Sequence, residues 1–301
     1  MLNSRRALLI LALAFCARGI ATAEDYAARF KQLHDEKAPA AQIDSVLDEW
    51  RAKQPDDPEA WVTSANYYFN QGQINISTKK PTGRDFVVKD VKTEKTAGSI
   101  SFEQDKESVK RAADLLQEAT AKFSDRLDIW CGLAWMNQEG GNFDNEFATL
   151  KKMVVYVREH PQGLKWLKGQ PIDEPADKFV AEKLHGYGTY YEKRENPTDD
   201  DHFLKIAMFS AEQFPNHPYA FNDVAVYYSI KGDNAKTREW LEKANKVDPK
   251  DTLVMTNLGY VCSKLGDNVA ARKWYEAVIK ADPNGELATR AKEGLSKLKK
   301  K

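Results

Sequence analysis

The feature that most constrains the fold of this chain is an internal repeat near its C-terminal end. Residues 218–251 and 252–285 align without a gap, and each segment is 34 residues long. Gly232-Asp233-Asn234 in the first segment matches Gly266-Asp267-Asn268 in the second. A fixed period of about 20–50 residues is typical of repeat architectures, in which each unit packs mainly on its neighbours. We therefore expect an array of repeats and not a single globular core.

Each repeat has the pattern of two helices joined by a tight turn. Apolar residues recur at helical spacing on both sides of the Gly-Asp step. Gly266 can adopt the left-handed conformation that ends a helix, and Pro283 cannot continue one. The absent side chain at Gly259 lets the first helix approach the second closely. Equivalent residues occupy the preceding segment.

These residues resemble the pattern of the tetratricopeptide repeat (TPR) family. That pattern has a bulky residue, Leu-Gly and Tyr in the first helix, a Gly-Asp turn, small and aromatic residues in the second helix and a closing Asp-Pro. Residues 252–285 supply Met255, Leu258-Gly259, Gly266-Asp267, Ala271, Tyr275 and Asp282-Pro283. They differ from the pattern at Cys262, where Tyr is usual. The resemblance implies a helical solenoid with a concave groove that binds a partner.

Weaker copies continue the same register toward the N-terminus. Four further helix pairs are expected in segments 24–57, 58–72 with 107–123, 127–153 and 176–215, and an amphipathic, Lys-rich capping helix in 286–301. We predict an all-α fold, a TPR α-solenoid of about six helix-turn-helix pairs with a C-terminal capping helix. The domain boundaries that follow are a signal peptide at 1–23, the array at 24–285 and the cap at 286–301.

An insertion at about 73–106 interrupts the second helix pair. It holds three short apolar runs, at 74–77, 86–91 and 99–102, with Thr, Gly and Pro between them. Runs of this kind predict short strands, so we expect a small β-hairpin-like insertion from the loop inside the repeat. A loop without strands is the alternative.

The N-terminal residues have the pattern of an export signal. Arg5-Arg6 precedes an apolar run at 7–15 that is too short to span a bilayer, and Ala21-Thr22-Ala23 has the form of a cleavage site. We expect cleavage after Ala23 and a periplasmic or secreted mature protein, with an uncleaved anchor as the alternative. A lipoprotein signal fits less well because bulky Phe15 precedes Cys16. The Leu-rich run favours general export over the twin-arginine route.

Composition excludes several classes of protein. With 45 basic and 45 acidic residues among 301, the chain has no global attraction for nucleic acid. The mean hydropathy of −0.63 excludes a polytopic membrane protein, so no stable membrane span is expected after signal cleavage. Three cysteines are too few for a disulfide scaffold. Cys131 and Cys262, which lie two repeats apart, are expected to be buried or groove-lining thiols.

No residue pattern indicates catalysis or metal binding. The sequence has no nucleophile elbow, phosphate-binding loop or dinucleotide fingerprint. Glu182 and His185 stand at metal-ligand spacing, but they form a single pair. Asp199-Asp200-Asp201 is better explained as favourable negative charge at a helix start. We expect no cofactor and no enzymatic activity.

The resemblance also implies which residues would contact a partner. In this family the groove is lined mainly by the first helix of each pair. Carried onto this sequence, the partner-binding residues are Asn66, Phe69, Trp135, Asn222, Val226, Asn257 and Tyr260. Asn257 matches a position that holds a peptide carboxylate in some members. The accompanying Lys and Arg are missing here, so no carboxylate clamp is expected.

The predicted function is a non-catalytic protein–protein interaction adaptor in the cell envelope. Its partner would be another envelope protein or a peptide segment, and the insertion would provide a second contact. One alternative is a glycan- or lipid-handling solute-binding protein, suggested by the aromatic residues Trp166, Tyr187, Tyr190 and Tyr191. A second alternative is an outer-membrane assembly subunit.

Overall fold

The computed structural model of the chain describes residues 25–79, 86–192 and 197–298. The signal sequence predicted at 1–23 lies outside these residues. The described residues divide after Pro55 into two compact units. The first unit contains helices α1 (Tyr26–Asp35) and α2 (Ala40–Lys53), which pack on each other. An ion pair of 3.2 Å between Arg29 Nη1 and Glu49 Oε2 joins these two helices.

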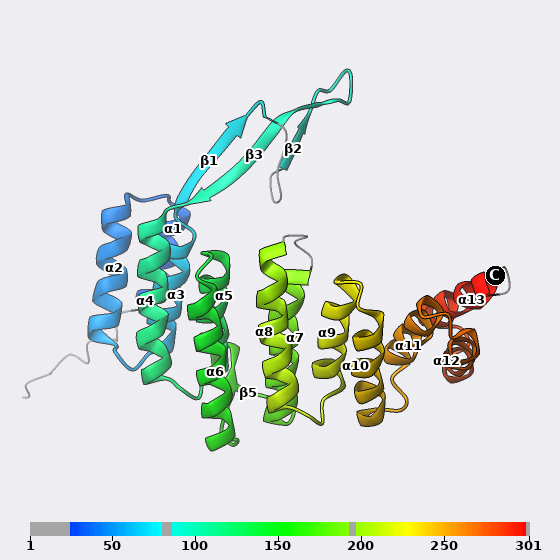
Figure 1. Cartoon of the computed structure of the whole chain (residues 1–301). Coiled ribbons are helices and arrows are strands. Elements are labelled where there is room, and N and C mark those ends of the chain that lie inside the picture. The colour runs from blue at the N-terminus through cyan, green and yellow to red at the C-terminus, as the bar shows by residue number, and fades with distance from the viewer. Residues whose placement is uncertain (1–24, 80–85, 193–196, 299–301) are drawn as a thin grey trace, which may run out of the picture. The chain divides into compact units, whose positions relative to one another are not determined.

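The second unit is a succession of helices with two small sheets inserted between them (Figure 1). Its helices are α3 (Pro58–Phe69), α4 (Lys106–Lys122), α5 (Leu127–Glu139), α6 (Phe143–Glu159), α7 (Ala176–Glu192), α8 (Pro197–Gln213), α9 (Pro218–Ile230), α10 (Asn234–Val247), α11 (Thr252–Lys264), α12 (Asn268–Ala281) and α13 (Glu286–Leu298). From α3 to α13 each helix contacts the next along the chain. Across the described residues, α1–α12 form six helix pairs and α13 follows them, which confirms the predicted fold class.

The Gly-Asp step has a separate role for each of its two residues. Gly232 and Gly266 both have positive φ, 75° and 80°, and each follows the last turn of a first helix. The next residue, an aspartate, is the N-cap of the second helix. The carboxylate of Asp233 accepts a hydrogen bond from Lys236 N, and that of Asp267 accepts one from Ala270 N. Glycine therefore ends one helix and aspartate caps the next, within two residues.

The last repeat and the capping helix share one buried aromatic ring. A Cβ atom added to Gly259 on α11 would lie 2.5 Å from the Tyr275 ring of α12. A Cβ atom added to Gly294 on α13 would lie 2.4 Å from the same ring. Tyr275 is therefore held between two glycine surfaces, and α13 covers the apolar side of α12 that an unfinished array would expose.

The middle of the array departs from the regular repeat length. Helices α6, α7 and α8 each have 17 residues, whereas α9 and α11 have 13. A two-stranded sheet, β4 (Lys165–Trp166) with β5 (Gln170–Pro171), and a short 3-10 helix at Leu167–Gly169 lie between α6 and α7. Longer helices and this connection account for the residues that exceed the repeat period. This small sheet was not predicted from the sequence.

The insertion between α3 and α4 is a three-stranded antiparallel sheet. Its strands are β1 (Gly72–Ser77), β2 (Phe86–Lys89) and β3 (Thr96–Gln104), in the order β1-β3-β2. The three strands contain the three predicted apolar runs or most of each run. Backbone bonds continue this sheet into the helices, since Asp105 N donates to Gln71 O at 2.9 Å. No helix among the described residues is long and apolar enough to cross a membrane.

Candidate partner-binding face

The first helices of successive pairs are joined by side-chain contacts. The rings of Phe69 on α3 and Trp135 on α5 lie 4.6 Å apart between centroids. Tyr187 on α7 donates its hydroxyl to Cys131 O on α5 at 2.6 Å. These contacts place α3, α5 and α7 beside one another on the same side of the array.

The same arrangement continues through α9 and α11. His185 Nδ1 on α7 lies 2.9 Å from both carboxylate oxygens of Asp223 on α9. Asn257 Nδ2 on α11 donates to Asn222 Oδ1 on α9 at 3.1 Å. Five first helices, α3, α5, α7, α9 and α11, therefore form one row, which we call the inner row.

The inner row carries a wide hollow between α5 and α7, which we call the aromatic hollow. Its volume is about 620 Å³, and Trp135 and Gln138 of α5, Tyr187 and Tyr190 of α7, and Trp166 of β4 are among the residues that line it. The Trp166 ring is held in place by Lys183, whose Nζ lies 4.5 Å from the ring centroid. Flat aromatic surfaces beside an amide group can pack on apolar side chains and bond a peptide backbone.

A buried polar network supports the aromatic hollow from below. Gln138 Nε2 donates to Glu146 Oε1 at 2.7 Å, and the Tyr191 hydroxyl donates to Glu146 Oε2. Burial of Glu146, which is 1% exposed, raises the pKa of its carboxyl group to about 8. Its hydrogen bonds to Tyr191 and Gln138 act in the opposite direction. The carboxyl group therefore gains a proton near neutral pH, and its hydrogen bond to Gln138 holds that side chain at the floor of the hollow.

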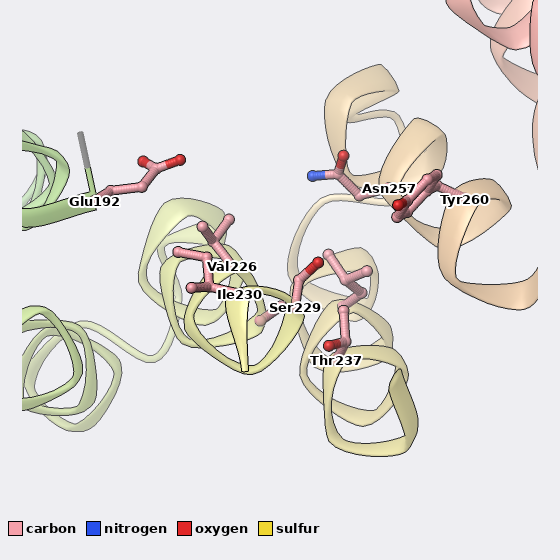
Figure 2. A pocket seen from close by; sticks show the side chains of 9 residues that line it. Glu192, Val226, Ser229, Ile230, Thr237, Asn257 and Tyr260 are labelled. Atoms are coloured by element: carbon pink, nitrogen blue, oxygen red, sulfur yellow. The ribbon is translucent and has the colours of Figure 1, made fainter. Parts of the chain in front are cut away.

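A second hollow lies between α9 and α11, and we call it the C-terminal hollow (Figure 2). Its volume is about 230 Å³. Figure 2 shows Val226 and Ser229 on α9, with Asn257 and Tyr260 on α11 facing the same space. The bond between Asn257 and Asn222 fixes the amide of Asn257 at the rim. An apolar floor with an oriented amide and hydroxyl groups suits a short segment of polypeptide.

The contact between α7 and α9 is sensitive to protonation. The hydrogen bond to Asp223 raises the pKa of His185 above its usual value, and burial of Asp223 raises the pKa of its own carboxyl group. Burial lowers the pKa of the nearby His217. The pair therefore holds a proton more tightly in the folded chain than its two side chains would in water.

The structure separates the seven predicted contact residues by exposure. Asn66, Trp135 and Tyr260 are exposed, and Val226 and Asn257 are half-buried. Phe69 and Asn222 are buried and act through their neighbours, because Phe69 supports Trp135 and Asn222 positions Asn257. Val226, Asn257 and Tyr260 share the C-terminal hollow, and Trp135 lines the aromatic hollow. The assignment of these residues to partner binding stays a prediction.

The aromatic residues of the solute-binding alternative do not all lie at one surface. Trp166, Tyr187 and Tyr190 line the aromatic hollow together with Trp135. Tyr191 is 1% exposed and instead donates to Glu146 below it. The network of Gln138, Glu146 and Tyr191 was not identified from the sequence, because these residues lie on three helices whose relative rotation has no local signal.

The described residues contain neither a cluster of metal ligands nor a thiol in a reactive environment. They contain no group of three or more His, Cys, Asp or Glu side chains placed to hold a metal ion. Cys131 and Cys262 are free, as the repeat spacing predicted, and both are buried. Burial raises the pKa of the Cys131 thiol to about 12, which leaves it protonated and weakly nucleophilic.

A family model matches part of the helical array. The tetratricopeptide repeat family model matches residues 254–284, which cover most of α11 and all of α12. No curated protein matches the sequence.

Several solved structures are similar to parts of the helical array. The first TPR of Spaghetti (RPAP3) bound to HSP90 peptide SRMEEVD is 20% identical, with a TM-score of 0.37 over 41% of this chain and 93% of that chain. The Sgt2 TPR domain from Aspergillus fumigatus is 27% identical, with a TM-score of 0.36 over 40% of this chain and 77% of that chain. YrrB, a TPR protein with an unusual peptide-binding site, is 12% identical, with a TM-score of 0.41 over 82% of this chain and 97% of that chain.

Proposed function

We propose that this chain, a tetratricopeptide repeat protein, is a non-catalytic adaptor that binds a segment of another protein along its inner row. The observation that carries the proposal is that two hollows open on one row of helices, each with a large exposed aromatic side chain. Trp135 is 42% exposed at the aromatic hollow, and Tyr260 is 49% exposed at the C-terminal hollow. Neither ring is needed to fill the core, so both are free to serve as anchors.

The chemistry of the two hollows suits a polypeptide. Trp and Tyr are the side chains that most often dominate binding energy in protein interfaces, because they bury a large area with few rotatable bonds. Asn257 and Ser229 at the C-terminal hollow offer an amide and a hydroxyl to backbone groups. Two anchors with few charged contacts give binding in the micromolar range, which allows the partner to exchange.

We further propose that the chain acts in the cell envelope, after export and cleavage following Ala23. The support is the Arg5-Arg6 pair, the short apolar run and the Ala21-Thr22-Ala23 site in the sequence. Mass spectrometry of the purified mature chain tests this directly. A first residue of Glu24 is expected, and a chain that retains Met1 or starts at a lipidated Cys16 would contradict it.

The binding proposal is tested by photo-crosslinking in cells from positions 135 and 260. A single protein crosslinked at both positions is the expected result, and mass spectrometry then identifies the contacted segment. A synthetic peptide of that segment is next titrated against the wild type and against Trp135→Glu and Tyr260→Glu. Charge in an apolar anchor site should weaken binding about 30-fold at Trp135 and about 10-fold at Tyr260.

Val269→Glu provides a matched control for these two variants. Val269 is 83% exposed on α12 and lines neither hollow, so the same new charge should leave affinity unchanged. If all three variants bind equally well and each has a wild-type unfolding curve, the inner row is not the binding face.

The aromatic hollow also supports a second candidate, a glycan- or lipid-handling protein. Trp135, Trp166, Tyr187 and Tyr190 present several rings around about 620 Å³, and sugar rings stack on such surfaces. A thermal shift screen with oligosaccharides and lipids distinguishes the two candidates, because a bound ligand raises Tm by mass action. A shift that Trp135→Glu abolishes, without any protein crosslink at position 260, would favour this candidate over the adaptor.

A further inference from the structure

The three-stranded sheet between α3 and α4 has one apolar face and one polar face. Residues paired across antiparallel strands point to the same side, so the register assigns each side chain to a face. We call one side the apolar face, and it consists of Ile74, Ile76, Phe86, Val88, Ile100 and Phe102. The opposite side carries Gln73, Asn75, Ser77, Val87, Ser99, Ser101 and Glu103.

The apolar face is exposed to solvent. Ile76 is 80% exposed, Phe86 75%, Ile74 70% and Phe102 51%. The described residues contain charged side chains at the two ends of the sheet but none within this face. Contiguous apolar surface of this kind is rare on a monomer and is usually covered by a partner. An alternating apolar strand pattern is normally produced by burial of one face, so the sequence itself implies a covered state.

The sheet is built as a defined structure. Asp90 closes the turn between β2 and β3, since its Oδ1 accepts hydrogen bonds from Thr93 N at 2.7 Å and Thr93 Oγ1 at 2.8 Å. Asn75 Nδ2 donates to Glu103 Oε2 at 2.9 Å on the polar face. Gln104 Nε2 donates to Phe69 O at 2.9 Å and ties the base of β3 to α3. The apolar face is therefore presented on a fixed platform.

The two ends of the sheet carry opposite charge. At the far end, around the turn between β2 and β3, the described residues include three lysines and two carboxylates: Lys89, Lys92, Lys95, Asp90 and Glu94. At the base, where β3 leads into α4, they include three carboxylates and one lysine: Glu103, Asp105, Glu107 and Lys106. The far end therefore has a positive excess and the base a negative excess.

This charge pattern favours one occupant for the apolar face. We propose that the face is covered by the same face of a second copy of this chain, with the two sets of strands running in opposite directions. A two-fold axis then places the lysine end of each sheet over the acidic base of the other. A surface of anionic lipid would attract the far end but repel the base.

The area is sufficient for a specific but reversible dimer. The exposed side chains of the apolar face offer on the order of 500 Å² in each copy, or about 1,000 Å² in total. This value is near the lower limit for a specific interface, so we expect dissociation in the micromolar range. Two stacked sheets of this type pack about 10 Å apart, with the side chains of the two faces interleaved. The dimer would carry two inner rows and could bind a partner that has two binding segments more tightly than either row alone.

The test is sedimentation of the full mature chain from about 1 to 100 μM. The wild type is expected to pass from monomer to dimer across this range. Ile76→Lys should be monomeric throughout, with the dimer dissociation constant raised at least 30-fold, because a lysine at the centre of the apolar face would be buried without a partner. Ser101→Lys introduces the same residue on the polar face and should dimerise as the wild type does.

A wild type that stays monomeric at 100 μM would overturn the proposal, as would a dimer that survives Ile76→Lys. Ile76 is exposed, so at about 1 μM, where both proteins are monomers, circular dichroism and Tm of the variant should match the wild type, and this check separates loss of dimer from loss of fold. Flotation with phosphatidylglycerol vesicles is the third measurement. If the wild type binds these vesicles and Ile76→Lys does not, the apolar face is covered by a membrane surface and not by a second copy, which would overturn the proposal.

Charge reversal tests the relative direction of the two sheets. Lys92→Glu with Lys95→Glu should weaken the dimer about tenfold, because two acidic ends would then face each other. Adding Glu103→Lys with Glu107→Lys to the same chain should restore it, since each reversed end again meets its opposite. If the variant with all four substitutions dimerises as weakly as the variant with two, the antiparallel arrangement is overturned.

Discussion

The C-terminal repeats, α9 to α12, and the middle helices, α5 to α8, share one architecture but are stabilised differently. In the C-terminal repeats a small residue faces an aromatic ring, as Gly259 faces Tyr275, and aspartates cap the helices. In the middle helices a buried network of Gln138, Glu146 and Tyr191 joins three helices. Repeats of regular length favour contacts that recur in each repeat. The longer helices of the middle region instead need contacts that occur at a single position in the array. The wider of the two hollows lies in that irregular region.

A large difference between the two regions is expected at their glycines. A Cβ atom at Gly259 would lie 2.5 Å from the Tyr275 ring, whereas one at Gly186 on α7 would meet nothing within 4 Å. Gly259→Ala should lower the free energy of unfolding by about 2–3 kcal/mol, because the ring cannot yield without disturbing α13. Gly186→Ala should raise it by about 0.5–1 kcal/mol, since alanine is the better helix former. Urea unfolding measures both, and equal effects would contradict the close contact.

An effect of pH is expected from Glu146 in the middle helices. The pKa of Glu146 is raised to about 8 in the folded chain. A carboxyl group with a raised folded pKa stabilises the fold fully below its unfolded pKa, and that contribution is lost as pH rises through the folded value. Between pH 5 and pH 8.5 the wild type should therefore lose about 3–4 kcal/mol relative to Glu146→Gln, which cannot ionise.

The comparison with Glu146→Gln isolates this one group. The pair of His185 and Asp223 is present in both proteins, so its own dependence on pH cancels in the difference. Unfolding free energies at the two pH values supply the measurement. Parallel curves for wild type and variant would mean that Glu146 ionises normally in the folded chain.

The smallest expected effect concerns helix caps. Asp251 caps α11 by accepting bonds from Leu253 N and Val254 N, whereas Asn142 before α6 makes no side-chain cap bond. Asp251→Ala should cost about 1 kcal/mol, and Asn142→Ala should cost close to nothing. Thermal unfolding of both variants measures this. A similar loss at both positions would show that capping does not distinguish the two regions.

The repeats were predictable because their signals are local. Gly266 with Asp267 ends one helix and caps the next within two residues, and the same step occurs at Gly232 with Asp233. The apolar runs of the insertion likewise predicted strands in a hairpin-like arrangement, and the structure has a sheet of three strands there. The order β1-β3-β2 was not predictable, because alternation along a strand does not determine which strand pairs with it.

The candidate site was predictable only in part. Helix position indicated Trp135 and Tyr260, and the structure leaves both exposed beside a hollow. The same reasoning selected Phe69 and Asn222, which are buried against the next helix of the inner row. Position within a repeat gives the direction of a side chain but not how closely the following pair approaches it.

The sequence by itself determined the period, the ends of the helices and the presence of a strand-forming insertion, because each depends on residues within about one turn or one strand. Only the tertiary structure decided which side chains of the inner row stay exposed, that Glu146 is buried beneath the aromatic hollow, and that all six side chains of the apolar face point to one side. These features depend on the crossing of neighbouring helices and the register of paired strands, which bring together residues far apart in the chain.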